Sequence, residues 1–194
     1  RDQAFALAKQ VADSGPGALL GGFVHTSNWN LQALENLLAS AQAHQLNVDL
    51  HMDEELNPQA QGLLRTTEIM QQIKFAGHVV CGHNCALSTQ DASLALRTLD
   101  EVAKVNMSLV TLPLTNLLLQ DAVIGKTPTQ RGVTLVQEAM ARGIPVMVVS
   151  DNVQDPFCTF GSYDPLEALT VGALAAQLPD VFDQATQSVC RSDW

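Results

Sequence analysis

Five short apolar runs recur about every 30 residues along the chain, and this spacing limits the possible folds more than any other feature of the sequence. The runs occupy residues 17–24, 47–52, 78–83, 107–114 and 144–152. Each run has the length and the apolar content of a buried β-strand. A repeat of this length is typical of successive βα units, so we predict one strand in each run.

Amphipathic segments separate these runs. In residues 30–45 the leucines recur at helical spacing, and the later segments repeat this pattern. Helix-end signals agree with it, because Gly143 stands where a C-cap is expected, and Asp164 and Pro165 suit an N-cap and the first helical position. We therefore predict helices over residues 30–45, 59–75, 91–105, 134–143 and 164–178.

Alternating helices and apolar strands predict a parallel sheet covered by helices. Two architectures fit this pattern, a doubly wound open sheet and a barrel. No glycine-rich phosphate loop follows any of the runs, which disfavours a nucleotide-binding open sheet. A (β/α)8 TIM barrel needs about 250 residues, whereas this chain has 194 residues and five predicted strands. We therefore predict an α/β chain whose residues 1–194 form one partial TIM-barrel domain, the later part of the barrel.

The composition favours a protein that acts on small molecules. The chain carries a formal charge of −10 and is 46% apolar, and an acidic surface disfavours nucleic acid and anionic membranes as partners. No run approaches the roughly 20 apolar residues of a membrane span, and the first residues do not resemble a signal peptide. We expect a cytoplasmic protein with reduced cysteines, which are Cys81, Cys85, Cys158 and Cys190.

Polar residues suited to catalysis or metal binding follow every predicted strand. In chain order they are His25, His51 with Glu54, His83, Asn116, and Asp151 with Asn152. In TIM barrels the chemistry lies at the C-terminal ends of the strands, so these side chains should meet at one mouth of the barrel. Histidines and carboxylates that converge from different strands are typical of a mononuclear catalytic metal site.

Each of these residues also has a simpler explanation. A single histidine after a strand is more often a loop residue than a ligand, and Asp53 and Glu55 could complement the dipole of the next helix. Asp151 and Asn152 could form a turn. Because polar residues of this kind follow several different strands, we favour the interpretation that they form one site together. The segment "CGHNC" does not indicate a structural zinc site, because no second cysteine pair stands at ligand spacing.

Five motifs together resemble a known family. "VDLHMDE", "GHVVCGHNCALS", "PLTNLLLQ", "RGVTLVQEAM" and "SDNVQDPF" are similar in order and spacing to the cytosine deaminase group of the amidohydrolase superfamily, from about Gly17 to Leu178. Members are (β/α)8 barrels with one divalent metal ion, iron or zinc. The resemblance implies that strands four to eight are represented here. It also implies that a metal-activated hydroxide deaminates a small nitrogen heterocycle, such as a cytosine-like pyrimidine.

The resemblance implies roles for four residues of the predicted site. His51 matches a metal ligand, and Glu54 matches the acid that shuttles protons. His83 matches a histidine that approaches the metal-bound water or the substrate. Asp151 matches a residue that is both a metal ligand and a general base. If burial raises the pKa of Glu54, this side chain can protonate a ring nitrogen and help ammonia leave.

Substrate contacts are expected from His83, Asn116, Asn152 and Phe157. The resemblance places Asn152 and Phe157 where the family carries an acidic residue and a bulky aromatic residue. Here "SDN" replaces the "HDD" of typical cytosine deaminases, and an asparagine both donates and accepts hydrogen bonds. Isocytosine-like pyrimidines, cyclic amides and N-alkylamino triazines therefore stay open as alternative substrates.

The H-x-H pair that supplies two metal ligands in the family does not occur, because no two histidines stand two positions apart. The sequence also begins without methionine. We therefore expect this chain to be part of a larger enzyme. We also expect that enzyme to be a homo-oligomer that acts on a small heterocyclic substrate. The alternative is a catalytically inactive binding protein.

Overall fold

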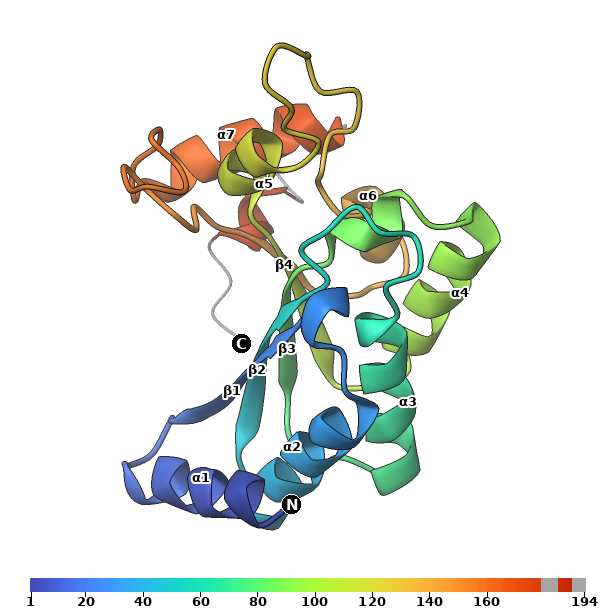
Figure 1. The fold of residues 1–194 in the computed structure, drawn as a ribbon, viewed down its shortest axis with the longest axis vertical. Coiled ribbons are helices and arrows are strands. Elements are labelled where there is room, and N and C mark those ends of the chain that lie inside the picture. Colours follow the sequence, from blue (N-terminus) through green and yellow to red (C-terminus); the bar gives the residue numbers. More distant parts are fainter. Residues whose placement is uncertain (179–184, 190–194) are drawn as a thin grey trace.

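A parallel β-sheet forms the centre of the molecule in a computed structural model that describes residues 1–178 and 185–189 (Figure 1). The elements, in chain order, are α1 (Asp2–Asp13), β1 (Leu19–Val24), η1 (Thr26–Asn28), α2 (Leu31–Ala43), β2 (Asn47–Met52), α3 (Gly62–Ile73), β3 (Val79–His83), η2 (Cys85–Ser88), α4 (Ala92–Val102), β4 (Met107–Thr111), α5 (Pro113–Leu119), α6 (Val136–Met140), β5 (Val146–Val148), α7 (Pro165–Ala176) and η3 (Ala185–Ser188).

The strand order decides between the two architectures that fit the sequence. The five strands lie in the order β1-β2-β3-β4-β5, and each neighbouring pair is parallel. Right-handed crossovers between consecutive strands carry each connecting helix to the same face of the sheet. A doubly wound sheet reverses its order at a switch point, and these five strands have no reversal. The prediction of a barrel segment is confirmed.

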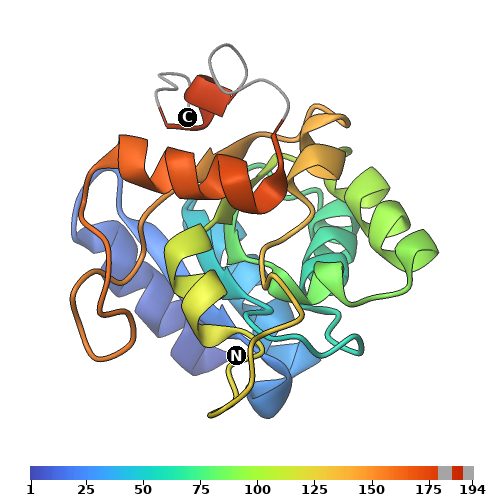
Figure 2. The same cartoon turned by 90° about the horizontal axis from the view of Figure 1, so that it is seen from above.

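All five predicted strands are present, but two of them end well before the predicted run does. The run 107–114 is a strand only to Thr111, and α5 begins at Pro113. Proline has no N–H for a sheet ladder, while its fixed φ suits the first turn of a helix. The run 144–152 forms a strand only at Val146–Val148. In both views α5 and α7 lie side by side beyond the end of β4 (Figure 1 and Figure 2).

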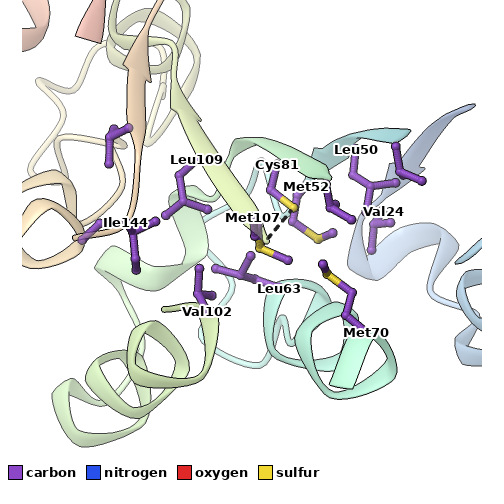
Figure 3. Close-up of a cluster of buried hydrophobic side chains, with 14 of the residues drawn as sticks. Val24, Leu50, Met52, Leu63, Met70, Cys81, Val102, Met107, Leu109 and Ile144 are labelled. Carbon is purple, nitrogen blue, oxygen red and sulfur yellow. Dashed lines mark hydrogen bonds between the residues drawn. The ribbon is translucent and has the colours of Figure 1, made fainter. Parts of the chain in front are cut away.

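The apolar core lies between the sheet and the helices that follow its strands (Figure 3). In β2, Val48, Leu50 and Met52 are fully buried, whereas Asp49 between them is exposed. Burying a side chain of this size contributes about 1.5–3 kcal/mol. The opposite face of β1 is open, with Leu19 and Phe23 46% and 53% exposed. In a closed barrel this second face points to the interior.

Two expectations from composition can be compared with the structure. Cys81, Cys85 and Cys158 are buried free thiols, and Cys190 lies outside the described residues. Among the helices of residues 1–178 and 185–189, none is both long enough and apolar enough to cross a membrane.

The start of α3 leaves no space for a side chain at Gly62. A Cβ atom there would lie 2.5 Å from both Asp53 Oδ1 and Met52 Sδ. We predict that Gly62→Ala lowers the free energy of unfolding by about 1–3 kcal/mol, because such overpacking forces neighbours to move. Gly21→Ala is the control, since its Cβ would meet only Asp49 O at 3.8 Å. Urea unfolding of both variants measures the difference, and equal midpoints would contradict the packing described.

Candidate active site

The carboxyl ends of three strands bring the predicted catalytic residues together. His51 lies near the end of β2, His83 is the last residue of β3, and Asp151 follows β5. The rings of His51 and His83 have centroids 4.2 Å apart, and His83 Nε2 lies 4.0 Å from Asp151 Oδ2. Glu54 reaches the same place from the loop after β2. The expected meeting of these side chains at one end of the sheet is therefore seen in the structure.

Unusual backbone conformations turn the chain at these strand ends. Asp53, His83 and Asp151 have φ values of 47°, 68° and 64°, in the left-handed region that non-glycine residues seldom occupy. Hydrogen bonds between neighbouring strand ends hold the first two turns, since Asp53 N donates to Val24 O and Asn84 N donates to Met52 O. Strained residues of this kind cost about 1–3 kcal/mol each and gather at functional sites.

The carboxylate of Glu54 is shared by three neighbours. Its Oε2 lies 2.9 Å from His51 Nε2, and its Oε1 lies 3.3 Å from His83 Nδ1. The side-chain amide of Asn116 donates to Oε1 at 3.1 Å. Burial raises the pKa of Glu54, but the neighbouring imidazoles, led by His51, outweigh burial and hold that pKa below its ordinary value. The raised pKa on which its role as an acid was made conditional is therefore not found, and Glu54 is a carboxylate near neutral pH.

His83 and Asp151 respond to burial in opposite directions. Burial lowers the pKa of His83 to about 4, so its imidazole is neutral near pH 7. Burial raises the pKa of Asp151, and the nearby hydroxyl of Thr115 opposes this effect. A raised pKa makes a carboxylate a better proton acceptor.

The residues present fit a divalent metal ion. The ligand atoms of His51, Glu54 and His83 all lie within 4.8 Å of one another. The buried atom His51 Nε2 has no hydrogen bond of normal geometry, although Glu54 Oε2 is only 2.9 Å away. This nitrogen of His51 is therefore available to bind a metal ion, which is the role that the motif resemblance gives to His51. Imidazole nitrogen and carboxylate oxygen are ligands that both zinc and iron accept.

Three residues that follow predicted strands lie outside this cluster. The side-chain amide of Asn152 donates to Asp155, and Phe157 is 64% exposed with its backbone N–H also bonded to Asp155. Their predicted contacts with substrate stay predictions. His25 lies beside Glu55, with 3.7 Å between Nε2 and Oε2. Asp155, which organises this loop, was not singled out from the sequence, because its role depends on contacts within the folded loop.

Sequence reasoning also missed Phe23, which supports the orientation of His51. The ring of Phe23 lies 4.6 Å from that of His51, and the two residues are directly paired between β1 and β2. Strand register was the signal that could have identified Phe23. Asp53 accepts a hydrogen bond from Leu63 N at the start of α3, which agrees with its suggested role at a helix N-terminus. Burial raises the pKa of Asp53 to about 6.

Comparison with known proteins agrees with the fold. A pterin deaminase from Rhizobium rhizogenes strain K84 is 38% identical over 192 residues, which cover 98% of this chain and 44% of that protein. The chain therefore spans less than half the length of this relative. The 5-methylcytosine deaminase of Klebsiella pneumoniae, solved with 5-fluorocytosine, has a TM-score of 0.79 at 22% identity, over 93% of this chain and 45% of that one.

A second solved structure has the same fold. The N-isopropylammelide isopropylaminohydrolase of Burkholderia multivorans gives a TM-score of 0.71 at 21% identity, over 93% of this chain and 44% of that one. At such identities the likeness concerns the fold alone. Residues 2–186 match the amidohydrolase family, so the family resemblance carried by the motifs is confirmed. The chain belongs to the amidohydrolase family.

Proposed function

We propose that this chain forms the proton-handling part of a metal-dependent deaminase that acts on a nitrogen heterocycle. The observation that carries the proposal is the contact of Glu54 with both His51 and His83, at 2.9 Å and 3.3 Å, beside Asp151. Family membership and the pterin deaminase relative support this reaction type. The four side chains come from three different strand ends, which argues against a chance cluster of surface charges.

His51 and Asp151 are the residues of this chain that would hold the metal ion. A bound divalent ion would supply Lewis acidity, which lowers the pKa of water from 15.7 to about 7. The exposed ring of Phe23 packs on His51 and restricts the orientation of its imidazole. Zinc and iron are both compatible with these ligands.

The carboxylates Glu54 and Asp151 would move the two protons of the attacking water. Glu54 starts as a carboxylate, accepts one proton, and passes it to the ring nitrogen beside the reacting carbon. Asp151 accepts the second proton from the added hydroxyl and passes it to the leaving amino group. The C–N bond breaks, ammonia leaves, and the ring carbon becomes a carbonyl, so atoms and charge balance.

For the substrate, we propose a ring with the 2-amino-4-oxo pattern that pterin and isocytosine share. The relative at 38% identity is a pterin deaminase. Asn152 is neutral and can both donate and accept hydrogen bonds, which suits a ring edge that alternates donors and acceptors. The aromatic side chains of Phe157 and Phe160 are 64% and 63% exposed on the loop after Asn152 and offer flat surfaces for a larger, two-ring substrate.

Metal analysis tests the first part of the proposal. We expect full-length protein to contain about one zinc or iron ion per chain, and His51→Ala to lose most of it. His44→Ala is the control, because His44 packs edge-on against Phe5 instead of joining the cluster. Elemental analysis after gel filtration gives the ratio. Retention of the metal by His51→Ala would contradict the assignment of this ligand.

Substitution of the two carboxylates tests the proton transfers. We predict that Glu54→Gln and Asp151→Asn each lower kcat by about 10²-fold or more, since neither amide can accept and return a proton. Glu68→Gln, in the exposed Arg65–Glu68 ion pair, should keep its rate. Ammonia release measures the effect. Near-normal turnover by either site variant would refute its role.

A substrate panel tests specificity. We expect release of ammonia from pterin and isocytosine, with kcat/KM for cytosine at least about tenfold lower. Asn152→Asp should reduce this preference, because an ionised carboxylate only accepts hydrogen bonds. Amine release from N-alkylamino triazines alone would favour the alternative hydrolase. Ligand binding with no release from any compound would favour an inactive binding protein.

A further inference from the structure

The side-chain amide of Asn116 lies between two candidate catalytic groups. Its Nδ2 atom is 3.1 Å from Glu54 Oε1 and 3.0 Å from His83 Nδ1. Asn116 lies on α5, which begins at Pro113 directly after β4, and its side chain is fully buried. Its NH₂ group therefore has these two neighbours as partners, whereas the amide oxygen Oδ1 is buried without a hydrogen-bond partner among the described residues.

The contact with Glu54 fixes the orientation of the amide. An ionised carboxylate only accepts hydrogen bonds, so the group that faces Glu54 must be the NH₂ group of Asn116 and not its oxygen. This NH₂ group has two hydrogens. One points to Glu54 Oε1, and the other is left for His83 Nδ1 at 3.0 Å.

The second hydrogen then determines where His83 carries its own proton. A nitrogen that accepts a hydrogen bond must have a free lone pair, so Nδ1 is unprotonated and the ring proton sits on Nε2. The opposite tautomer would donate from Nδ1 to Glu54 Oε1 at 3.3 Å. It would also set two N–H groups against each other, His83 Nδ1 and Asn116 Nδ2, at 3.0 Å.

We propose that Asn116 is a positioning residue that holds His83 as the Nε2–H tautomer, the form in which His83 can take the role that the family resemblance implies for it. The reaction itself rests on the function proposed above. Nε2 faces Asp151 Oδ2 at 4.0 Å, so its N–H points to the side where the added oxygen would develop negative charge. A protonated nitrogen has no lone pair for a metal, which leaves His51 and Asp151 as the ligands.

Nitrogen NMR of histidine-labelled, full-length, zinc-loaded protein tests this directly. The signals of His83 are assigned by their loss in His83→Gln. We expect Nδ1 of His83 to have the chemical shift of an unprotonated imidazole nitrogen, and Nε2 to have that of a protonated one. A proton on Nδ1 would overturn the proposal, and so would a chemical shift of Nε2 that shows it bound to the metal ion. This measurement needs no catalysis, so a protein that fails to deaminate any substrate would contradict the proposed function and leave the tautomer result valid.

Asn116→Leu tests whether Asn116 causes this state. Without the amide, Glu54 is the remaining neighbour of Nδ1, so the ring proton should move to Nδ1 and kcat should fall by about 10²–10³-fold, with less effect on KM. The control is Thr98→Val, which removes a buried hydroxyl that donates to Leu94 O on α4 and should leave the tautomer unchanged. An unchanged tautomer in Asn116→Leu would refute the causal role. If that variant does not fold, the wild-type spectrum still decides where the proton lies.

Discussion

The carboxylate of Glu54 is the interaction on which the candidate site depends. It receives contacts from β2, from β3 and from α5, through His51, His83 and Asn116. A half-buried charge is expensive unless it is paired, and each of these neighbours lowers that cost. The same contacts keep Glu54 ionised and hold both imidazoles within reach of one small volume. The pairing of the Glu54 carboxylate with these neighbours therefore holds His51 and His83 in the arrangement that the proposed reaction requires.

The fold serves this arrangement by placing the ends of consecutive parallel strands side by side. The order β1-β2-β3-β4-β5 keeps α2, α3 and α4 on one face, where Leu50, Met52 and their neighbours form the core (Figure 1). Left-handed turns at Asp53 and His83 then end β2 and β3 abruptly, and Asp151 has the same kind of backbone conformation in the loop after β5. The strain of these turns is tolerated because hydrogen bonds between strand ends hold the backbone in place. The free energy gained by burying the core thus offsets the cost of the positive φ values at the candidate site.

Burial has different consequences for neighbouring groups in this site. It favours neutral His83, it makes Asp151 a better proton acceptor, and at Glu54 its effect is outweighed by nearby imidazoles. Titratable groups with contrasting environments are the usual basis for separate acid and base roles.

The sequence alone determined the element types and the composition of the site. Apolar runs and helical leucine spacing predicted five strands and their helices, because period and length are local properties of the chain. Polar residues at strand ends, with the motif resemblance, predicted His51, Glu54, His83 and Asp151. Only the tertiary structure decided the strand order, the end of β4 at Thr111 and the packing of Phe23 on His51. It also gave Glu54 a lowered pKa in place of the raised one on which its role as an acid was conditional, and it placed Asn116 between Glu54 and His83. These features depend on distances between residues far apart in the chain, which local pattern cannot supply.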